Sequence, residues 1–201
     1  MKALGKGSLA SIVRTGLVWA WYGLWVLAGL WVLAAIGYGA ILVLIANGMM
    51  DPALLEGGDG NLAVGSGSGN FHVTYDQPGG GTWPIAVPGL LIAAVAIIGS
   101  LIIVWRLRKL FDSFSSGEPF QRENAQHLRV IWITMLAIEI ARYLLMALTG
   151  VLVATFGEPN LETTFSFAID ISTWGSILIL IVLAEVFREG ARLKEEQELT
   201  I

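Results

Sequence analysis

Four long apolar segments, separated by polar stretches, constrain this chain more than any other feature of its sequence. They run over approximately residues 17–46, 85–106, 130–156 and 165–187. An α-helix needs about 20 predominantly apolar residues to cross the hydrocarbon core of a bilayer. Because each segment reaches that length, we predict a single all-α membrane domain over residues 1–201, built as a bundle of four transmembrane helices.

The amino-acid composition also indicates a membrane environment. Hydrophobic residues make up 55% of the chain and charged residues only 14%, whereas soluble domains are about 25% charged. The first apolar segment is about twice as long as the 7–15 residues of a secretory signal core, so we interpret it as a retained anchor. The chain has no cysteine, which excludes disulfides, thiolate metal sites and cysteine nucleophiles.

The positions of the basic residues predict the orientation in the membrane. Eleven of the twelve Lys and Arg residues lie before the first segment, at or within the loop 107–129, or in the tail 188–201. The loops 47–84 and 157–164 contain no Lys or Arg. Basic residues are enriched on the cytoplasmic side of membrane proteins. We therefore expect both chain ends in the cytoplasm of a cell whose cytoplasmic (inner) membrane holds this multi-pass protein.

The long outer loop contains one segment with the composition of a β-strand. Two Gly-rich stretches, 57–70 and 78–82, flank the sequence Phe71-His72-Val73-Thr74-Tyr75, which alternates bulky and smaller residues. This segment can pair with Leu62-Ala63-Val64 in a small hairpin. A flexible external loop is the alternative, and the pattern does not decide between them.

Helical patterns extend beyond the apolar segments on the cytoplasmic side. Four apolar residues recur at helical spacing after the second segment, which predicts one or two further turns: Leu107, Leu110, Phe111 and Phe114. A new helix is expected to begin near Gln121 and to run into the third segment. Residues 188–198 indicate a charged extension of the fourth helix. There Arg192 lies three or four residues from three acids: Glu189, Glu195 and Glu196.

Ionisable residues inside the apolar segments form the first candidate site. Glu139 and Arg142 lie one helical turn apart in the third segment, and Asp170 lies near the outer end of the fourth. Charged groups in a bilayer are costly and are usually paired or functional. We predict a polar cluster of these three residues that links the third and fourth helices. It is either a static ion network that fixes helix register or a proton, ion or ligand site.

The chain lacks the motifs of the common enzyme classes. It contains no metalloprotease H-E-x-x-H, phosphate-binding loop, dinucleotide fingerprint or G-x-S-x-G elbow. It also lacks a basic soluble domain that would bind nucleic acid directly. We therefore expect a protein that is not an enzyme and that carries no metal or cofactor.

Two stretches of the chain contain recognisable motifs: LRKLFDSFSSGEPFQRENAQHLRVI over residues 107–131 and LAEVFREGARLKEEQELTI over residues 183–201. They resemble the inner-loop signature and the C-terminal ending of a bacterial membrane family, the domain-of-unknown-function 2975 family. The first match rests on Gly117, Glu118, Pro119, Phe120 and Asn124, and the second on Glu185, Phe187, Gly190, Leu193, Glu195 and the terminal Leu199-Thr200-Ile201. The family often has Thr-Pro where this chain has Gln121 and Arg122, so the hydroxyl that would cap the following helix is missing.

The resemblance implies a regulatory partner rather than an activity. Members of the family resemble companions of small helix-turn-helix repressors of the Cro/CI type, which implies a membrane-bound regulator. The expected partner surface comprises Gly117, Glu118, Pro119, Phe120, Asn124, Glu185, Phe187, Arg188 and Arg192. The apolar residues of this region can instead pack against one another and the lipid headgroups. A small transporter or channel accessory that uses the polar cluster is the alternative function, and self-association into a homo-oligomer is left open.

Overall fold

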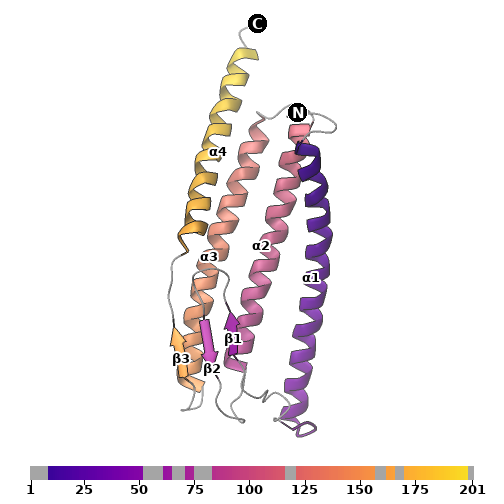
Figure 1. Cartoon of the computed structure of the whole chain (residues 1–201), viewed down its shortest axis with the longest axis vertical. Helices are drawn as coiled ribbons and strands as arrows, with labels where there is room; N and C mark the ends of the chain where they lie inside the picture. Colours follow the sequence, from indigo (N-terminus) through magenta and orange to yellow (C-terminus); the bar gives the residue numbers. More distant parts are fainter. Residues whose placement is uncertain are drawn as a thin grey trace. The chain divides into compact units, whose positions relative to one another are not determined.

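A computed structural model describes residues 9–51, 61–64, 71–74, 83–115, 121–156, 162–165 and 170–198. Within these residues the chain forms four long helices and three short strands (Figure 1). The helices are α1 (Leu9–Ala46), α2 (Trp83–Ser115), α3 (Arg122–Phe156) and α4 (Ile171–Glu198). The strands are β1 (Asn61–Val64), β2 (Phe71–Thr74) and β3 (Glu162–Phe165).

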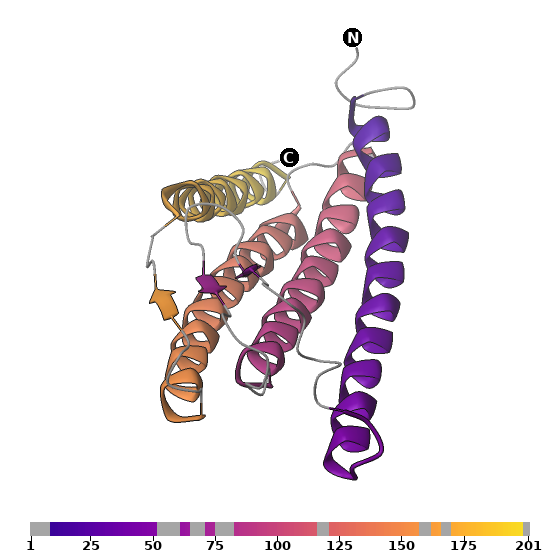
Figure 2. The ribbon, with the colours of Figure 1, turned by 60° about the horizontal axis from the view of Figure 1, so that its bottom comes forward.

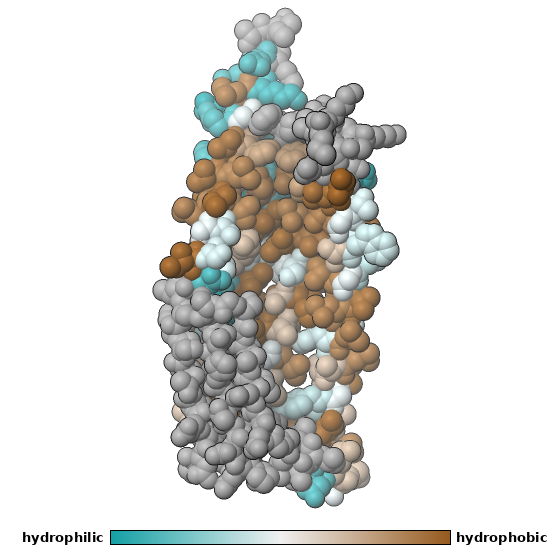
Figure 3. Space-filling model, in the orientation of Figure 1, coloured by the Kyte–Doolittle hydropathy of each residue, from teal (hydrophilic) through white to brown (hydrophobic). Residues whose placement is uncertain are grey.

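All four helices are long and apolar enough to cross a membrane. Their apolar side chains are largely exposed: Trp19 is 75% exposed, Leu33 67% and Leu178 64%. Figure 3 shows apolar residues over much of the visible helix surface and hydrophilic residues at the C-terminal end of α4. Such extensive apolar exposure is stable only against an apolar solvent. The chain is therefore a multi-pass membrane protein, as the four apolar segments predicted.

The end of α1 is set by local sequence. Gly48 follows the last turn with a φ of 70°, a left-handed conformation that glycine adopts without steric cost. The N–H of Gly48 donates to the carbonyl of Ile45 at 2.9 Å, and the N–H of Met49 donates to that of Leu44 at 3.0 Å. This pair of bonds is a Schellman motif, which satisfies the final carbonyls of the helix and turns the chain away.

The helices are longer than the apolar segments that predicted them. The helical extension expected after the second segment is present, because α2 continues to Ser115, and α4 continues to Glu198 as the charge pattern indicated. The start of the fourth helix differs from the expected boundary at residue 165. Phe165 is the last residue of β3, and α4 begins at Ile171. The β-branched Thr163-Thr164 pair favours a strand over helix at this point.

The strands form one antiparallel sheet in the order β1-β2-β3. Val64 of β1 lies opposite Phe71 of β2, and Phe71 in turn lies opposite Phe165 of β3. The sheet therefore joins the connection between α1 and α2 to the connection between α3 and α4.

The chain divides into two compact units, each assembled from separate stretches of sequence. The first unit comprises Met1–Leu27, Ala96–Glu139 and Ser172–Ile201, and the second comprises Ala28–Val95 and Ile140–Ile171. All four helices contribute residues to both units, α4 with Ile171 alone to the second, and each runs as a continuous ribbon (Figure 2).

Aromatic side chains connect the helices of the second unit. The indole N–H of Trp31 in α1 donates to the carbonyl of Leu90 in α2 at 3.1 Å. The rings of Trp83 in α2 and Phe156 in α3 lie 5.4 Å apart between centroids. A donated indole N–H is favourable in an apolar environment, where an unbonded donor is costly.

In the first unit, α2 and α3 pack closely together at a glycine. A Cβ atom added to Gly99 would lie 2.3 Å from Cδ1 of Ile138 and 2.6 Å from its Cγ1. Gly99 itself is buried. Small residues allow the backbones of membrane helices to pack closely, so Gly99 sets the spacing of this helix pair.

We therefore expect Gly99→Ala to destabilise the protein by about 1–3 kcal/mol, because Ile138 must move to accommodate the added methyl group. Thermal unfolding in detergent micelles measures this effect. The matched control is Gly175→Ala in α4, where a Cβ would meet no atom within 4 Å. Ile138→Ala in the Gly99→Ala background should restore part of the loss. Equal unfolding temperatures for the two alanine variants would contradict this account of the contact.

Candidate functional site

The polar ends of three helices form a packed structure in the first unit. At its centre, Leu110 of α2, Leu128 of α3 and Ala184 of α4 are 5%, 2% and 9% exposed. Partly buried apolar residues surround them: Leu107, Phe114, Trp132, Leu180 and Phe187. This core fixes the helical extensions beyond the apolar segments relative to one another.

Two of the aromatic residues of this core contact each other directly. The rings of Phe114 and Phe187 stack with centroids 5.8 Å apart and an interplanar angle of 17°. Phe187 was expected on a partner surface, with self-packing as the alternative. Its ring is half-buried against α2, so in this structure it serves the internal core.

Asn124 occupies a similar internal position. It is only 1% exposed, and its side-chain amide donates a hydrogen bond to Oγ of Ser113 in α2. The family motif placed Asn124 on the expected partner surface, but a side chain this deeply buried is not available to a docked protein. It joins α3 to α2, and the backbone N–H of Asn124 also donates to the carbonyl of Gln121 at the helix start, at 3.0 Å.

Two ion pairs connect the helices at the surface of this region. Arg14 of α1 lies 2.7 Å from Asp112 of α2, and Arg122 of α3 lies 3.6 Å from Glu195 of α4. The four side chains are all at least half exposed, so each pair contributes less than about 1 kcal/mol. Their main effect is to orient the helix ends.

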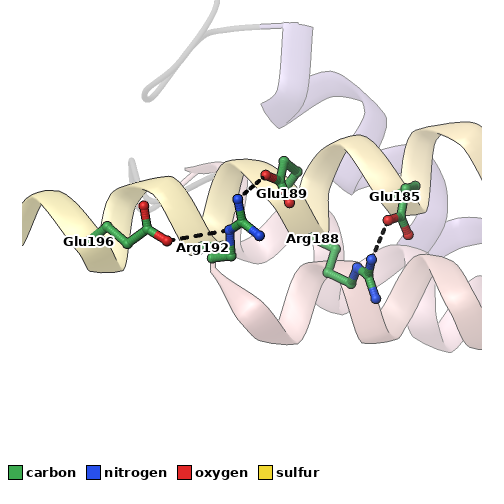
Figure 4. A network of polar contacts seen from close by, with 5 residues as sticks. All are labelled: Glu185, Arg188, Glu189, Arg192 and Glu196. Atoms are coloured by element: carbon green, nitrogen blue, oxygen red, sulfur yellow. Dashed lines mark hydrogen bonds and ion pairs between the residues drawn. The ribbon is translucent and has the colours of Figure 1, made fainter.

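The exposed face of α4 carries a ladder of ion pairs (Figure 4). Arg188 pairs with Glu185, and Arg192 lies between Glu189 at 2.6 Å and Glu196 at 3.4 Å. The spacing of three or four residues places these side chains along one face of the helix. Two of the acids expected to meet Arg192 therefore do so, while Glu195 pairs with Arg122 of α3.

A groove of about 840 Å³ lies between α3 and α4 in the first unit. We call it the α3–α4 groove. Its lining residues are Arg122, Ala125, Gln126, Arg129, Trp132, Ile181, Ala184, Glu185, Arg188, Glu189 and Arg192. The sequence interpretation included Glu185, Arg188 and Arg192 but missed Arg129 and Trp132. Arg129 follows Arg122 by seven residues and precedes Trp132 by three, which places all three on one face of α3, and this spacing was the available signal.

A second, smaller hollow of about 440 Å³ lies between α2 and α3. We call it the polar hollow, because it is lined by Lys109, Asp112, Ser113, Gln121, Glu123, Asn124, Gln126 and His127. Nη1 of Arg106 lies 3.3 Å from Nδ1 of His127, in position to donate to the neutral ring. His127 precedes the apolar stretch that begins near residue 130. Burial, followed by the charges of Arg106 and Lys109, lowers the pKa of His127, and Glu123 opposes this effect.

The predicted intramembrane cluster stays a prediction, and its three residues lie in α3 and directly before α4. Glu139 is buried, with 5% exposure, in the part of α3 that belongs to the first unit. Arg142 is half-buried in the second unit, and its guanidinium lies 5.2 Å from the centroid of the Tyr143 ring. Asp170 directly precedes α4, at the N-cap position where a carboxylate stabilises a helix start. That position gives Asp170 a structural role of its own.

Some predicted residues lie outside the described part of the chain. They are Gly117, Glu118, Pro119 and Phe120 of the first motif and Leu199, Thr200 and Ile201 of the second. Among the residues that the structure does describe, no group of three or more His, Asp or Glu side chains is arranged to hold a metal ion.

Comparisons with known proteins bear on the region that contains this site. Searches among curated proteins and among solved structures returned no match. A family described as "Protein of unknown function (DUF2975)" matches residues 81–201, which include α2, α3, α4 and both hollows. Because this match covers more than half of the chain, the protein belongs to the DUF2975 family.

Proposed function

We propose that the protein is a non-enzymatic membrane regulator whose cytoplasmic helix ends bind a soluble helix-turn-helix transcription factor. The observation that carries this proposal is the core formed by Leu110, Leu128 and Ala184 at the polar ends of α2, α3 and α4. A loop between α2 and α3 that served only to lead the chain back into the membrane would not need such a core. A pre-packed surface binds a partner with a smaller ordering cost than a flexible loop does.

The polar hollow is the part of this region best suited to a protein partner. Glu123 and Gln126 are exposed at its edge, and Gln121 in its lining directly follows the motif residues 117–120. Exposed charged and amide side chains on a well-packed helix surface can orient a bound protein and make its binding specific. The resemblance to companions of Cro/CI-type repressors supports the choice of partner class.

The proposal requires both chain ends on the cytoplasmic side of the cytoplasmic membrane. The distribution of Lys and Arg supports this orientation. Pairing of β2 with β3 requires only that the two basic-free connections lie on the same side of a bilayer. The choice of the outer side for them rests on the Lys and Arg distribution alone. The Gly-rich outer loop with its small β-hairpin would then face away from the cytoplasm.

Single-cysteine labelling tests the orientation cleanly, because the chain has no native cysteine. Met49 is 76% exposed just after α1, and Gln197 is exposed near the end of α4. In intact cells we expect a membrane-impermeant thiol reagent to modify Met49→Cys but not Gln197→Cys. Permeabilisation should make Gln197→Cys reactive. The reverse labelling pattern would place the helix ends outside the cytoplasm and remove the basis of the proposal.

Affinity purification of the full-length protein from its native membrane tests the partner. We expect a helix-turn-helix protein to co-purify with the wild type. Its recovery should fall at least about tenfold for Glu123→Arg. A like or misplaced charge at an interface makes the binding free energy less favourable by more than about 1.4 kcal/mol, which corresponds to that factor. Asp51→Arg is the matched control, because it makes the same charge change in the opposite loop. Mass spectrometry with quantification of the recovered protein gives the readout.

Two outcomes would count against the partner hypothesis. If no soluble regulator co-purified with the wild-type protein, the proposed regulatory function would be contradicted. Equal recovery of a regulator by Glu123→Arg and Asp51→Arg would show that the polar hollow is not the docking surface.

A second candidate function, transport of an ion or proton, is favoured by the burial of Glu139 within an apolar helix. In this case proteoliposomes containing the protein should show a flux that Glu139→Gln abolishes. Glu196→Gln in the exposed part of α4 is the control and should retain the flux. Absence of flux with the wild-type protein would exclude this candidate under the gradients tested.

A further inference from the structure

We propose that the α3–α4 groove binds the phosphate headgroup of an anionic phospholipid, with an acyl chain of the same lipid against Trp132 and Ile181. This site is independent of the regulatory function proposed above. It requires only that the helices lie in a bilayer. Three features of the groove support this site: its basic side chains, the order of its residues along the helices, and the length over which its lining changes from apolar to basic.

The groove is lined by more basic than acidic groups. Four arginines and two glutamates line it. Three of the arginines already pair with acids: Arg122 with Glu195, Arg188 with Glu185, and Arg192 with Glu189 and Glu196. Within the part of the chain that the structure describes, Arg129 has no acidic side chain within ion-pair distance. A guanidinium has five N–H donors and binds phosphate oxygens in a bidentate manner. Arg129 is therefore the residue best placed to hold the headgroup.

The other arginines retain donors for a ligand despite their ion pairs. The side chain of Arg188 is 68% exposed while it pairs with Glu185, and that of Arg192 is 61% exposed while it pairs with two acids. These pairs hold the guanidinium groups along the edge of the groove. Because a guanidinium has five N–H donors, each of these arginines keeps donors beyond those that face its acidic partners.

The lining changes from apolar to basic along the helix axes. Trp132, Ile181 and Ala184 belong to the apolar stretches, and Arg129 and Arg188 follow them toward the polar helix ends. Ile181 and Arg188 are seven residues apart, or about 10 Å along the helix. The polar interfacial layer of a bilayer is roughly 5–8 Å thick on each side. The lining of the groove thus changes from apolar to basic over about the distance that separates the acyl chains of a lipid from its phosphate. Tryptophan, the residue type at position 132, is typical of that interface.

These features select a lipid over a soluble acidic peptide. A peptide would meet the arginines but would leave the apolar end of the groove facing the bilayer. Basic pockets between membrane helices are established sites for anionic headgroups. An amphipathic lipid satisfies both parts of the lining at once.

Lipid binding to the purified full-length protein in detergent can be measured by native mass spectrometry, with phosphatidylglycerol and phosphatidylcholine as the two probes. We expect preferential retention of phosphatidylglycerol. Arg129→Gln should weaken its binding by about fivefold, since one basic residue near an anionic headgroup contributes about that factor. Arg108→Gln, which makes the same charge change on α2 outside the groove, should change binding less than twofold. Arg188→Gln in the Arg129→Gln background should weaken binding further.

Thermal unfolding of each variant without added lipid separates lost binding from lost folding, because Arg129 is exposed and its replacement should not lower the unfolding temperature. Equal binding of the two lipids would overturn the proposal, as would equal effects of Arg129→Gln and Arg108→Gln. Displacement of phosphatidylglycerol by a soluble glutamate-rich peptide would assign the groove to a peptide and overturn it as well. Failure to recover a transcription factor would leave these lipid measurements unaffected.

Discussion

A bilayer interior supplies no hydrogen bonds to a polypeptide backbone, and this constraint governs the rest of the structure. Each crossing segment must satisfy its own N–H and C=O groups, which a helix does completely. Large apolar side chains such as Trp19 and Leu178 can then remain exposed, because lipid rather than water surrounds them. Tight burial is consequently confined to a few places, including the contact of Gly99 with Ile138 and the core at the helix ends.

Outside the hydrocarbon core, the helix ends must be held by interactions that also operate in water. The stacked Phe114 and Phe187 rings and the hydrogen bond from Asn124 to Ser113 provide them for α2, α3 and α4. Burial of the apolar groups supplies most of the stability, since the exposed ion pairs contribute little. The polar hollow is lined mainly by residues of α2 and α3, and the α3–α4 groove is lined by residues of α3 and α4. The proposed docking surface and the proposed lipid site therefore use different pairs of helices.

The ionisable residues of the apolar segments differ in what their positions allow. Asp170 at the start of α4 has the location of a helix cap, and its charge is favourable there on electrostatic grounds alone. Glu139 has no such explanation from helix geometry, and it is deeply buried. The burial of Glu139 within an apolar helix is the observation behind the transport candidate.

Hydropathy and charge alone were sufficient to locate the four helices and to predict the helical extensions, because period and length are properties of contiguous sequence. They also marked Glu139, Arg188 and Arg192 as residues of interest. They did not identify Arg129 as part of a groove, or Asn124 as a buried link, and they set the start of the fourth helix at residue 165 instead of Ile171. Those features depend on which side chains from distant segments meet. Neither the pairing of β2 with β3 nor the packing of α3 against α4 produces a periodic pattern in the sequence of either partner.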